Sequence, residues 1–408
     1  MKREHLITAA TCLVILSVLL TCFRILDLNA GRDHLKIGFI YDNDESTPYT
    51  YNFSLAVDAL EKKYAAEKKN GKTVDIVTRS NVLDEEMEEP LRELAGKDGE
   101  ACDIIFFNGY SELVMKLASE YPDVQFCQTS YMDMSGKTVP DNYHTFKGEA
   151  YQCRYVSGIA AGMKIRQMIS EGIISEDQAL AGFVAAFPTS EVISGYTAFV
   201  LGIRSVVPTA KMLVRYTYTW SSYALEKSAA KQLIDDGCVV ISQHTDTIGP
   251  ALACEEMIEK KPVYFVGYNQ SRSDVAPGTS LITSRICWEE YVLSAVEALM
   301  KDKSIEKALS GHARIHGSDV SAGFESGWVE MDDLNAQIMA PGTQEAMDKA
   351  IDQFKKGKDD LVFKGNYTGI DPDNPSDICD LNKGYIENEN TSYPLFHYIL
   401  KDVVTIIE

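Results

Sequence analysis

The chain has 408 residues, and 60 aspartates and glutamates outweigh 39 lysines and arginines to give a net charge of −21. With 45% hydrophobic residues it is a globular protein that is too long for one small core, so two domains are expected. The acidic balance argues against a nucleic-acid partner, because phosphate groups would be repelled rather than neutralised.

The first residues predict an export signal that anchors the protein to a bacterial cell membrane. Lys2 and Arg3 precede an uncharged stretch from Leu6 to Thr21, which is short for a membrane span. The stretch ends in LLTC, similar to the lipobox of bacterial lipoproteins, although Thr21 is unusual before the cleavage point. We expect Cys22 to be lipidated, with an uncleaved signal anchor within residues 1–30 as the alternative. Either arrangement places the rest of the chain outside the cytoplasm.

Beyond residue 35, short apolar runs alternate with longer amphipathic segments. The runs lack period-two alternation, as is typical of parallel strands buried on both faces. They predict two series of strands, followed by a strand at 280–286 that crosses between the series. The series are 36–42, 73–79, 102–108 and 124–130, then 181–187, 211–218, 238–245 and 263–269. The predicted helices are 53–64, 85–94, 112–120, 151–173, 191–206, 224–236 and 250–259.

This βαβ repetition predicts an α/β protein with two lobes, each containing a doubly wound parallel sheet. We expect residues 35–148 with about 270–318 to form the first lobe. Residues 149–269 with about 319–408 would form the second. The last sixty residues are acidic and polar, which predicts a loop-rich end with one closing helix.

In doubly wound sheets, ligands bind beyond the carboxyl ends of the strands, so the residues after each predicted strand are candidates. These residues are rich in aromatic and neutral polar types, which favours a flat heteroaromatic small molecule. The candidates are Asp42, Asn108, Tyr110, Phe187, Trp220, His244, Thr245, Asp246 and Asn269. Three more, Tyr49, Tyr51 and Asn52, open the first helix, where an ordinary helix start is the alternative. Trp288 either lines the cleft or packs in the core.

His244 and Asp246 also fit acid–base chemistry, because residues i and i+2 after a strand share one side. No serine or cysteine nucleophile can be placed beside them, and GxSxG, Walker, GxGxxG and HExxH motifs are absent. Catalysis, ligand contact and a structural role in the loop stay open, and the missing nucleophile favours ligand contact. The seven cysteines after the signal form no CxxC pair, so no metal site and no cofactor are expected.

Several long segments carry a resemblance to one family. They are YPDVQF (121–126), GEAYQCRYVSGIAAG (148–162), GFVAAFPTSEVISGYTAFVLGIRSVVP (182–208), GCVVISQHTD (237–246) and VGYNQ (266–270). In this order they resemble the QHTD branch of the basic membrane protein family. Its members are the lipoprotein substrate-binding components of ABC importers and include purine nucleoside receptors. The resemblance covers nearly everything after residue 35.

The resemblance implies a type I periplasmic-binding-protein fold, with two Rossmann-like lobes joined by a hinge of several crossings. It also implies a monomer that holds its ligand between aromatic rings. By position, Asp42 matches the aspartate that closes the first strand, and Tyr49 matches a tryptophan of the branch. We expect Tyr51 and Trp220 to stack on the ligand ring. The expected partners of the ring edges are His244, Asp246, Asn269 and Asn108.

Two positions depart from the nucleoside receptors of this family, which hold ribose hydroxyls with an aspartate and a lysine. Here those positions are Asn269 and Cys287. Losing both charged partners removes hydrogen bonds of roughly 1.5–3 kcal/mol each, which favours a purine base such as adenine, or a related heterocycle, over a nucleoside.

We therefore expect an extracytoplasmic binding protein, not an enzyme, that presents a purine-like ligand to an ABC permease. One alternative is an extracytoplasmic receptor that senses the ligand and signals to a membrane partner. The other is a nucleoside-processing enzyme that works in the same cleft.

Overall fold

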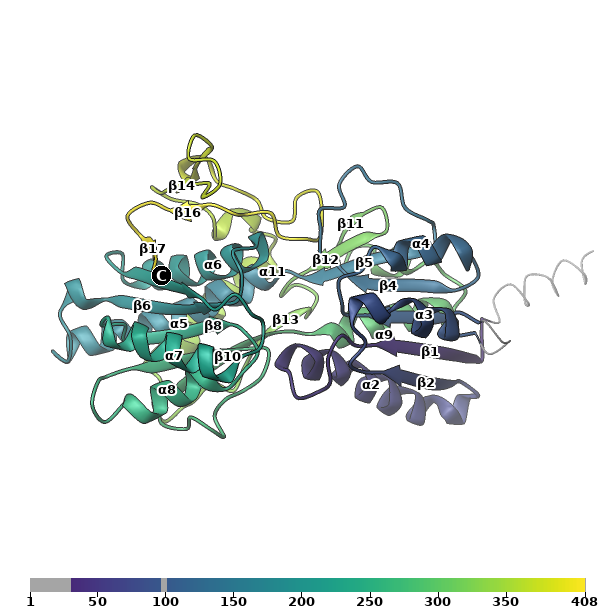
Figure 1. Ribbon diagram of the computed structural model, residues 1–408, viewed down its shortest axis with the longest axis horizontal. Coiled ribbons are helices and arrows are strands. Elements are labelled where there is room, and N and C mark those ends of the chain that lie inside the picture. Colours follow the sequence, from purple (N-terminus) through teal and green to yellow (C-terminus); the bar gives the residue numbers. More distant parts are fainter. Residues whose placement is uncertain (1–30, 97–100, 408) are drawn as a thin grey trace, which may run out of the picture.

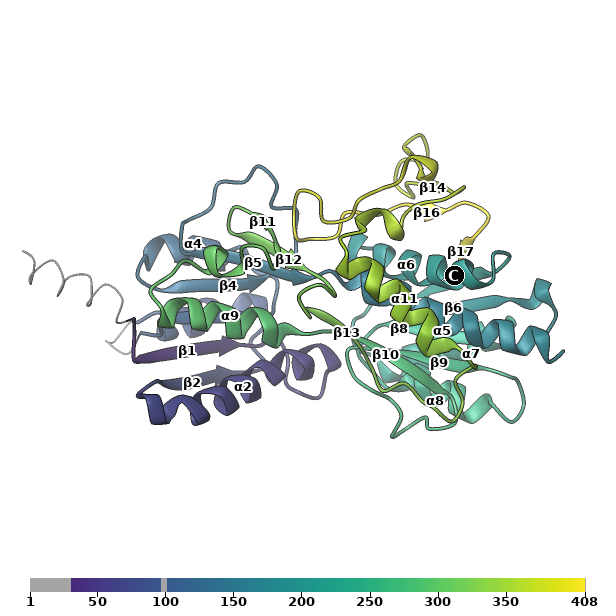
Figure 2. The same cartoon turned by 180° about the vertical axis from the view of Figure 1, so that it is seen from behind.

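The chain folds into two α/β lobes, each built around a seven-stranded sheet (Figures 1 and 2). The computed structural model describes residues 31–96 and 101–407. This architecture confirms the predicted fold class. In the described part of the chain, no helix is long and apolar enough to cross a membrane. The predicted anchor and Cys22 lie outside the described residues.

The first lobe, drawn in purple and blue with green segments in Figure 1, has the strand order β11-β12-β5-β4-β3-β1-β2. All neighbouring strands are parallel except the pair of β11 and β12. The strands are β1 (His34–Ile40), β2 (Thr73–Arg79), β3 (Ile104–Phe107), β4 (Gln125–Thr129), β5 (Tyr143–Gly148), β11 (Arg314–His316) and β12 (Asp319–Ala322). The helices are α2 (Pro48–Glu67), α3 (Glu88–Leu94), α4 (Leu113–Glu120), α9 (Trp288–Met300) and α10 (Ile305–Leu309).

The second lobe has the order β13-β10-β9-β8-β6-β7-β17, so its core strands repeat the winding of the first lobe. Only β13 runs antiparallel to its neighbour among these described strands. The strands are β6 (Leu180–Ala185), β7 (Lys211–Tyr216), β8 (Val240–His244), β9 (Tyr264–Tyr268), β10 (Ser280–Ile286), β13 (Val329–Asp332) and β17 (Val404–Ile406). The helices are α5 (Ala150–Ser170), α6 (Ser190–Val206), α7 (Tyr223–Asp235), α8 (Gly249–Met257) and α11 (Thr343–Lys355).

Alternate residues of the apolar strands pack on opposite faces of each sheet. In the first lobe, Phe39 and Phe106 pack with α2 on one face, whereas Ile40 and Phe107 pack with α3 and α4 on the other. In the second lobe, Phe183 packs with α5 and α6, and Val184 and its neighbours pack with α7 and α8. Burial on both faces explains why these strands are continuous apolar runs in the sequence.

The chain passes between the lobes three times: between β5 and α5, between β10 and α9, and between β12 and β13. The sequence analysis expected returns at about residues 270 and 319. Strand β10 (280–286), however, pairs within the second sheet, and β12 (319–322) pairs within the first. Strands β5 and β12 were also not among the predicted strands.

The last part of the chain forms a small antiparallel sheet on the second lobe, shown in yellow-green in Figure 1. Its strands are β14 (Thr368–Ile370), β15 (Ile378–Asp380) and β16 (Ile399–Leu400). The helix α11 precedes this sheet, and the chain returns to the second lobe through β17, which pairs with β7. The expected closing helix is therefore replaced by strands.

Candidate functional site

Residues at the carboxyl ends of strands in both lobes enclose a small space, which we call the inter-lobe cavity. Its volume is about 60 Å³. Ligand pockets typically measure roughly 300–1,000 Å³, so a ring-sized ligand needs the lobes to move apart before it enters. The lining residues are Asp42, Asn43, Tyr49 and Tyr110 from the first lobe, and Glu191, Trp220, His244, Asp246, Tyr268 and Asn269 from the second.

Aromatic rings approach the cavity from both lobes. The Tyr49 hydroxyl donates to the backbone oxygen of Asn108 at 3.1 Å and lies 3.1 Å from the Thr129 hydroxyl, which fixes the ring in place. On the other side, the Trp220 ring lies 6.1 Å from the His244 ring, which lies 4.7 Å from the Tyr268 ring. Aromatic rings from both lobes therefore border the inter-lobe cavity.

The charged groups that line the cavity are all acidic. They are Asp42, Glu191 and Asp246, and no lysine or arginine is among the described lining residues. Burial raises the pKa of Asp42 above its usual value. The Thr50 hydroxyl, which donates to this carboxylate at 3.2 Å, lowers the pKa and so opposes the effect of burial. Burial, and then Glu226 and Asp42, raise the pKa of Asp246 to about 7, with Arg272 opposing. Such a lining suits ligand N–H donors and disfavours anionic ligands.

His244 is a neutral imidazole held at the end of β8. Burial lowers its pKa well below the usual value, and the nearby charges of Arg154 and Lys147 lower it further. Its Nδ1 has no hydrogen-bond partner among the described residues. The buried Arg154 also makes no side-chain hydrogen bond there, and its guanidinium carbon lies 3.5 Å from the Tyr268 ring centroid. Arg154 therefore supports the rings of the cavity from behind and disfavours a charged His244.

Seven of the sequence-predicted site residues line the cavity: Asp42, Tyr49, Tyr110, Trp220, His244, Asp246 and Asn269. Six of them lie at or just after the carboxyl ends of strands, where ligands of doubly wound sheets bind, a relation that we call the strand-end rule. The seventh, Tyr49, lies at the start of α2. The loops after β7 and β8 are joined by a hydrogen bond of 2.9 Å from the Asp246 backbone N–H to the Trp220 oxygen. This bond holds two of the second-lobe candidates together.

The first-lobe and hinge candidates include residues that the structure places outside the lining. Tyr51 is 37% exposed and is not among the lining residues, whereas Tyr49 of the same helix is. Asn52 is buried and bonds across the hinge: its Nδ2 donates to the Ile286 oxygen and, at 3.4 Å, to Asn269. Asn108 is buried behind Asp42, whose backbone N–H donates to its Oδ1 at 3.0 Å.

Three further candidates also lie behind the lining. Phe187 packs on Trp220 with ring centroids 5.5 Å apart. Thr245 is buried next to His244 and is not among the lining residues. Trp288 is 1% exposed and packs in the first-lobe core against Tyr49 and Phe53, in agreement with the core alternative.

Three lining residues are not among the site residues predicted from the sequence: Asn43, Glu191 and Tyr268. Asn43 and Tyr268 adjoin the predicted candidates Asp42 and Asn269, so a wider window at each strand end would have included them. Glu191 lies in the first turn of α6, whose start is capped by the Thr189 side chain. Its carboxylate forms a 2.8 Å ion pair with Lys147 of the first lobe, a contact that no local pattern predicts.

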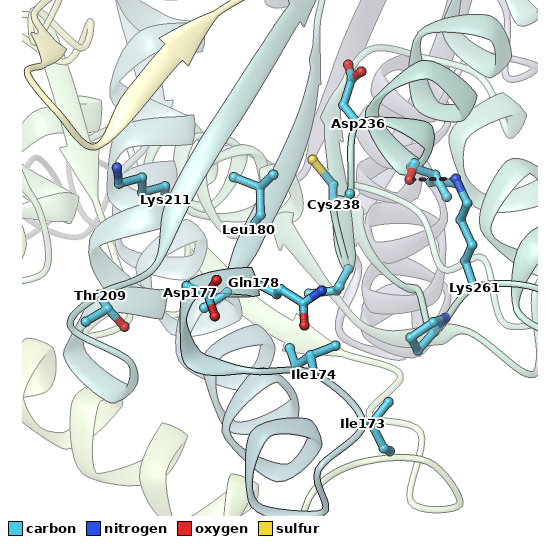
Figure 3. A pocket seen from close by; sticks show the side chains of 15 residues that line it. Ile173, Ile174, Asp177, Gln178, Leu180, Thr209, Lys211, Asp236, Cys238 and Lys261 are labelled. Carbon is cyan, nitrogen blue, oxygen red and sulfur yellow. Dashed lines mark hydrogen bonds between the residues drawn. The ribbon is translucent and has the colours of Figure 1, made fainter.

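A larger cavity, of about 610 Å³, lies at the opposite end of the second lobe (Figure 3). It is lined by residues at the amino ends of β6, β7 and β8, including Leu180, Lys211 and Val239. Ligands of doubly wound sheets bind at the carboxyl ends instead. The inter-lobe cavity is therefore the better candidate site despite its smaller volume.

Near the third sheet, Asp371, Asp377 and His397 bring possible metal-ligating atoms within 4.8 Å of one another. Protein groups already engage them, since His397 Nδ1 lies 2.8 Å from the Leu395 oxygen and the Tyr398 hydroxyl donates to Asp377. The sequence predicted no metal site, and hydrogen bonding accounts for this cluster.

Comparison with known proteins identifies relatives over most of the chain. A family model described as "ABC transporter substrate-binding protein PnrA-like" matches residues 37–357. A purine-binding protein of Brucella abortus is 27% identical over 271 residues, which cover 66% of this chain and 70% of that protein.

One further relative matches part of the sequence, and one solved structure matches the fold. TsgA13 of Haloferax volcanii, whose name proposes a glucose-binding role in an ABC transporter, is 31% identical over 199 residues. That match covers 48% of this chain and 46% of TsgA13. An ABC transporter solute-binding protein of Conexibacter woesei superposes with a TM-score of 0.58 at 16% identity, covering 79% of this chain and 97% of that one.

Proposed function

Because the chain belongs to the PnrA-like family of ABC transporter substrate-binding proteins, we propose that it binds a purine base or a related heterocycle between its lobes. The family membership confirms the resemblance noted in the sequence. Proteins of this family bind substrates outside the cytoplasm rather than convert them, and they deliver them to an ABC permease. Lipid anchoring through Cys22 is part of the proposal.

The observation that carries the ligand class is the lining of the inter-lobe cavity. The lining combines the rings of Tyr49 and Tyr110 from the first lobe and of Trp220 and Tyr268 from the second with three carboxylates, and it contains no cation among the described residues. A purine offers two flat faces for such rings and several N–H groups for the carboxylates. Phosphorylated or carboxylated ligands would meet only like charge.

His244, Asp246 and Asn269 suit the edges of a stacked heterocycle. The neutral His244 offers one donor and one acceptor, and Asn269 offers an amide with both. Asn269 is held with φ 62 and accepts at 3.4 Å from the Ile286 backbone N–H, so its side chain is fixed at the hinge. These groups bond the ligand without a nucleophile beside them, which accords with binding rather than catalysis.

The residues of this chain at the positions that hold the ribose in nucleoside receptors differ from those of the receptors. Cys287 is 3% exposed and lies outside the lining, and burial raises its thiol pKa above the usual range. No charged group therefore replaces the lysine of those receptors at this position. This supports a free base over a nucleoside.

The relatives point to two ligand classes, a purine and glucose, so the first experiment should discriminate between them. The protein would be purified from its native host and unfolded, and the released small molecule identified by mass spectrometry. We expect a purine base or an analogue of one, at near one molecule per protein. Recovery of glucose or another sugar would contradict the proposal, and recovery of a nucleoside would contradict the absence of a ribose subsite.

A further inference from the structure

The segment 387–396, which we call the C-terminal latch, contacts both lobes. It lies beyond residue 357, where the match to the family model ends. In Figure 1 it is part of the yellow segment that leaves the small sheet above the second lobe. This segment reaches the first lobe beside β5 and β11. Its central residues Thr391 and Ser392 are each 1% exposed, so the contact is a packed interface rather than a surface loop.

Asp319 of β12 anchors the latch to the first lobe. Its buried carboxylate accepts from the Thr391 hydroxyl at 3.0 Å, from the Ser392 backbone N–H at 2.7 Å and from the Ser392 hydroxyl. Within the first lobe the same carboxylate accepts from Thr145 at 2.7 Å. Charge-assisted bonds to a buried carboxylate are among the stronger polar contacts in proteins.

Glu387 and Pro394 anchor the latch to α6 of the second lobe. The Ser194 hydroxyl donates to Glu387 at 2.8 Å, and the Ser190 hydroxyl donates to the Pro394 oxygen at 2.8 Å. Glu387 also accepts from the backbone N–H groups of Leu395 and Phe396. The chain then continues into β16 and β17, so the latch is joined covalently to the second lobe. Its contacts with the first lobe include Asp319 and also Ser130, Met134 and His316.

Between the two anchors, Tyr393 lies beside an ion pair that also crosses the lobes. The Lys147 ammonium of β5 lies 5.3 Å from the Tyr393 ring centroid and 2.8 Å from the Glu191 carboxylate. Lys147 is 2% exposed and Glu191 lines the inter-lobe cavity. The latch therefore packs against the cation that holds one wall of the cavity in place.

We propose that the C-terminal latch restrains the separation of the lobes and, through Tyr393 and Lys147, positions the Glu191 carboxylate in the cavity. Opening the lobes breaks the bonds of Asp319 to Thr391 and Ser392 together with the Lys147–Glu191 ion pair. Tyr393 and Lys147 are positioning residues, since they act on the cavity through Glu191. The effect on ligand kinetics rests on the proposed function, whereas the effect on lobe separation does not.

Small-angle X-ray scattering of the ligand-free full chain tests the restraint without any ligand. The double variant Thr391→Val/Ser392→Ala removes two hydroxyl donors of Asp319, and Tyr393→Ala removes the ring over Lys147. Both should show a larger maximum dimension than the wild type. Tyr393→Phe, which keeps the ring, and Ser376→Ala, an exposed serine of the same C-terminal region, should superpose on the wild type. Circular dichroism confirms that each variant is folded. Scattering curves of the two latch variants that match the wild type would overturn the proposal.

Stopped-flow binding of adenine separates this inference from the proposed function. Tyr393→Ala should release adenine about fivefold faster, which lies within the range expected of a cation–π contact, whereas Tyr393→Phe should stay within about twofold of the wild type. Equal release rates for Tyr393→Ala and the wild type would overturn the positioning role. If even the wild type fails to bind adenine, the proposed ligand is wrong, and the scattering result still decides whether the latch restrains the lobes.

Discussion

Trp220 and Tyr49 reach the inter-lobe cavity from opposite lobes and are fixed by different contacts. Phe187 and His244 flank the Trp220 ring, whereas the Tyr49 hydroxyl is held by the Asn108 backbone. In the proposed binding mode, a ligand that stacks on one ring gains the contact with the second ring only when the lobes are close together. These two rings therefore couple recognition to lobe closure.

Truncating Trp220 should weaken purine binding. The Trp220→Ala variant loses a stacking face, so we expect a loss of at least about 1 kcal/mol, roughly fivefold in Kd, by calorimetry with adenine. Tyr51→Ala is the matched control, because that ring is exposed and outside the cavity lining. A normal affinity for Trp220→Ala would refute its role, and a loss in Tyr51→Ala would restore the role that the sequence alone had suggested.

The ionisation of Asp246 should make purine affinity depend on pH. Burial, followed by the charges of Glu226 and Asp42, raises its pKa to about 7, and Arg272 acts in the opposite direction. Ligand N–H donors prefer the ionised carboxylate, so affinity should rise between about pH 6 and pH 8 as the proton leaves. His244 adds no slope there, since its pKa is lowered well below the usual value and it stays neutral.

The Asp246→Asn variant provides the control for this pH dependence. Its amide does not titrate, so the calorimetric affinity should become flat across the same range. An unchanged slope in Asp246→Asn would assign the titration to another group, with Asp42 the next to examine because burial raises its pKa as well.

The strand-end rule predicts most residues of the candidate site. The residues that it does not predict correctly are decided by side-chain packing. Asp42, Trp220 and His244 were predictable because the carboxyl ends of parallel strands meet at one edge. Tyr49 and Tyr51 were both candidates, and only the rotation of α2 on its sheet decides which one faces the cavity. Glu191 reaches the site through an ion pair with Lys147, more than forty positions earlier in the chain.

At the scale of elements, the strands with apolar runs were predictable and the polar strands at the hinge were not. Every residue of β5 (YHTFKG) is buried, although several of its side chains are polar. Tertiary partners satisfy them, such as Glu306 for His144, Asp319 for Thr145 and Glu191 for Lys147. Because those partners come from distant parts of the chain, no local pattern marks β5 or β12 as a buried strand.

The contact between α5 and α6 requires glycine and offers a test of the second-lobe packing. A Cβ on Gly202 would lie 2.1 Å from the Tyr155 oxygen on α5, so the helices would have to separate. We expect Gly202→Ala to lower the free energy of unfolding by about 1–3 kcal/mol in denaturant titrations. Gly195→Ala in the same helix is the control, since its Cβ would meet nothing closer than 3.4 Å. Equal stability of the two variants would contradict this packing.

At the scale of the whole molecule, two lobes of like winding enclose one shared site. Each lobe presents the carboxyl ends of its strands to the other, and three chain crossings form the hinge between them. The closed arrangement leaves only about 60 Å³ between them. In the proposed function, binding therefore requires opening, entry and closure of the lobes.

Calorimetric titration of the full chain, refolded to remove any bound molecule, tests the central claim most directly. Adenine, guanine and hypoxanthine would be titrated in parallel with adenosine and glucose. The account predicts saturable one-to-one binding of at least one free purine base, tighter than that of adenosine and without a response to glucose. Binding of glucose with no response to any purine base would contradict it.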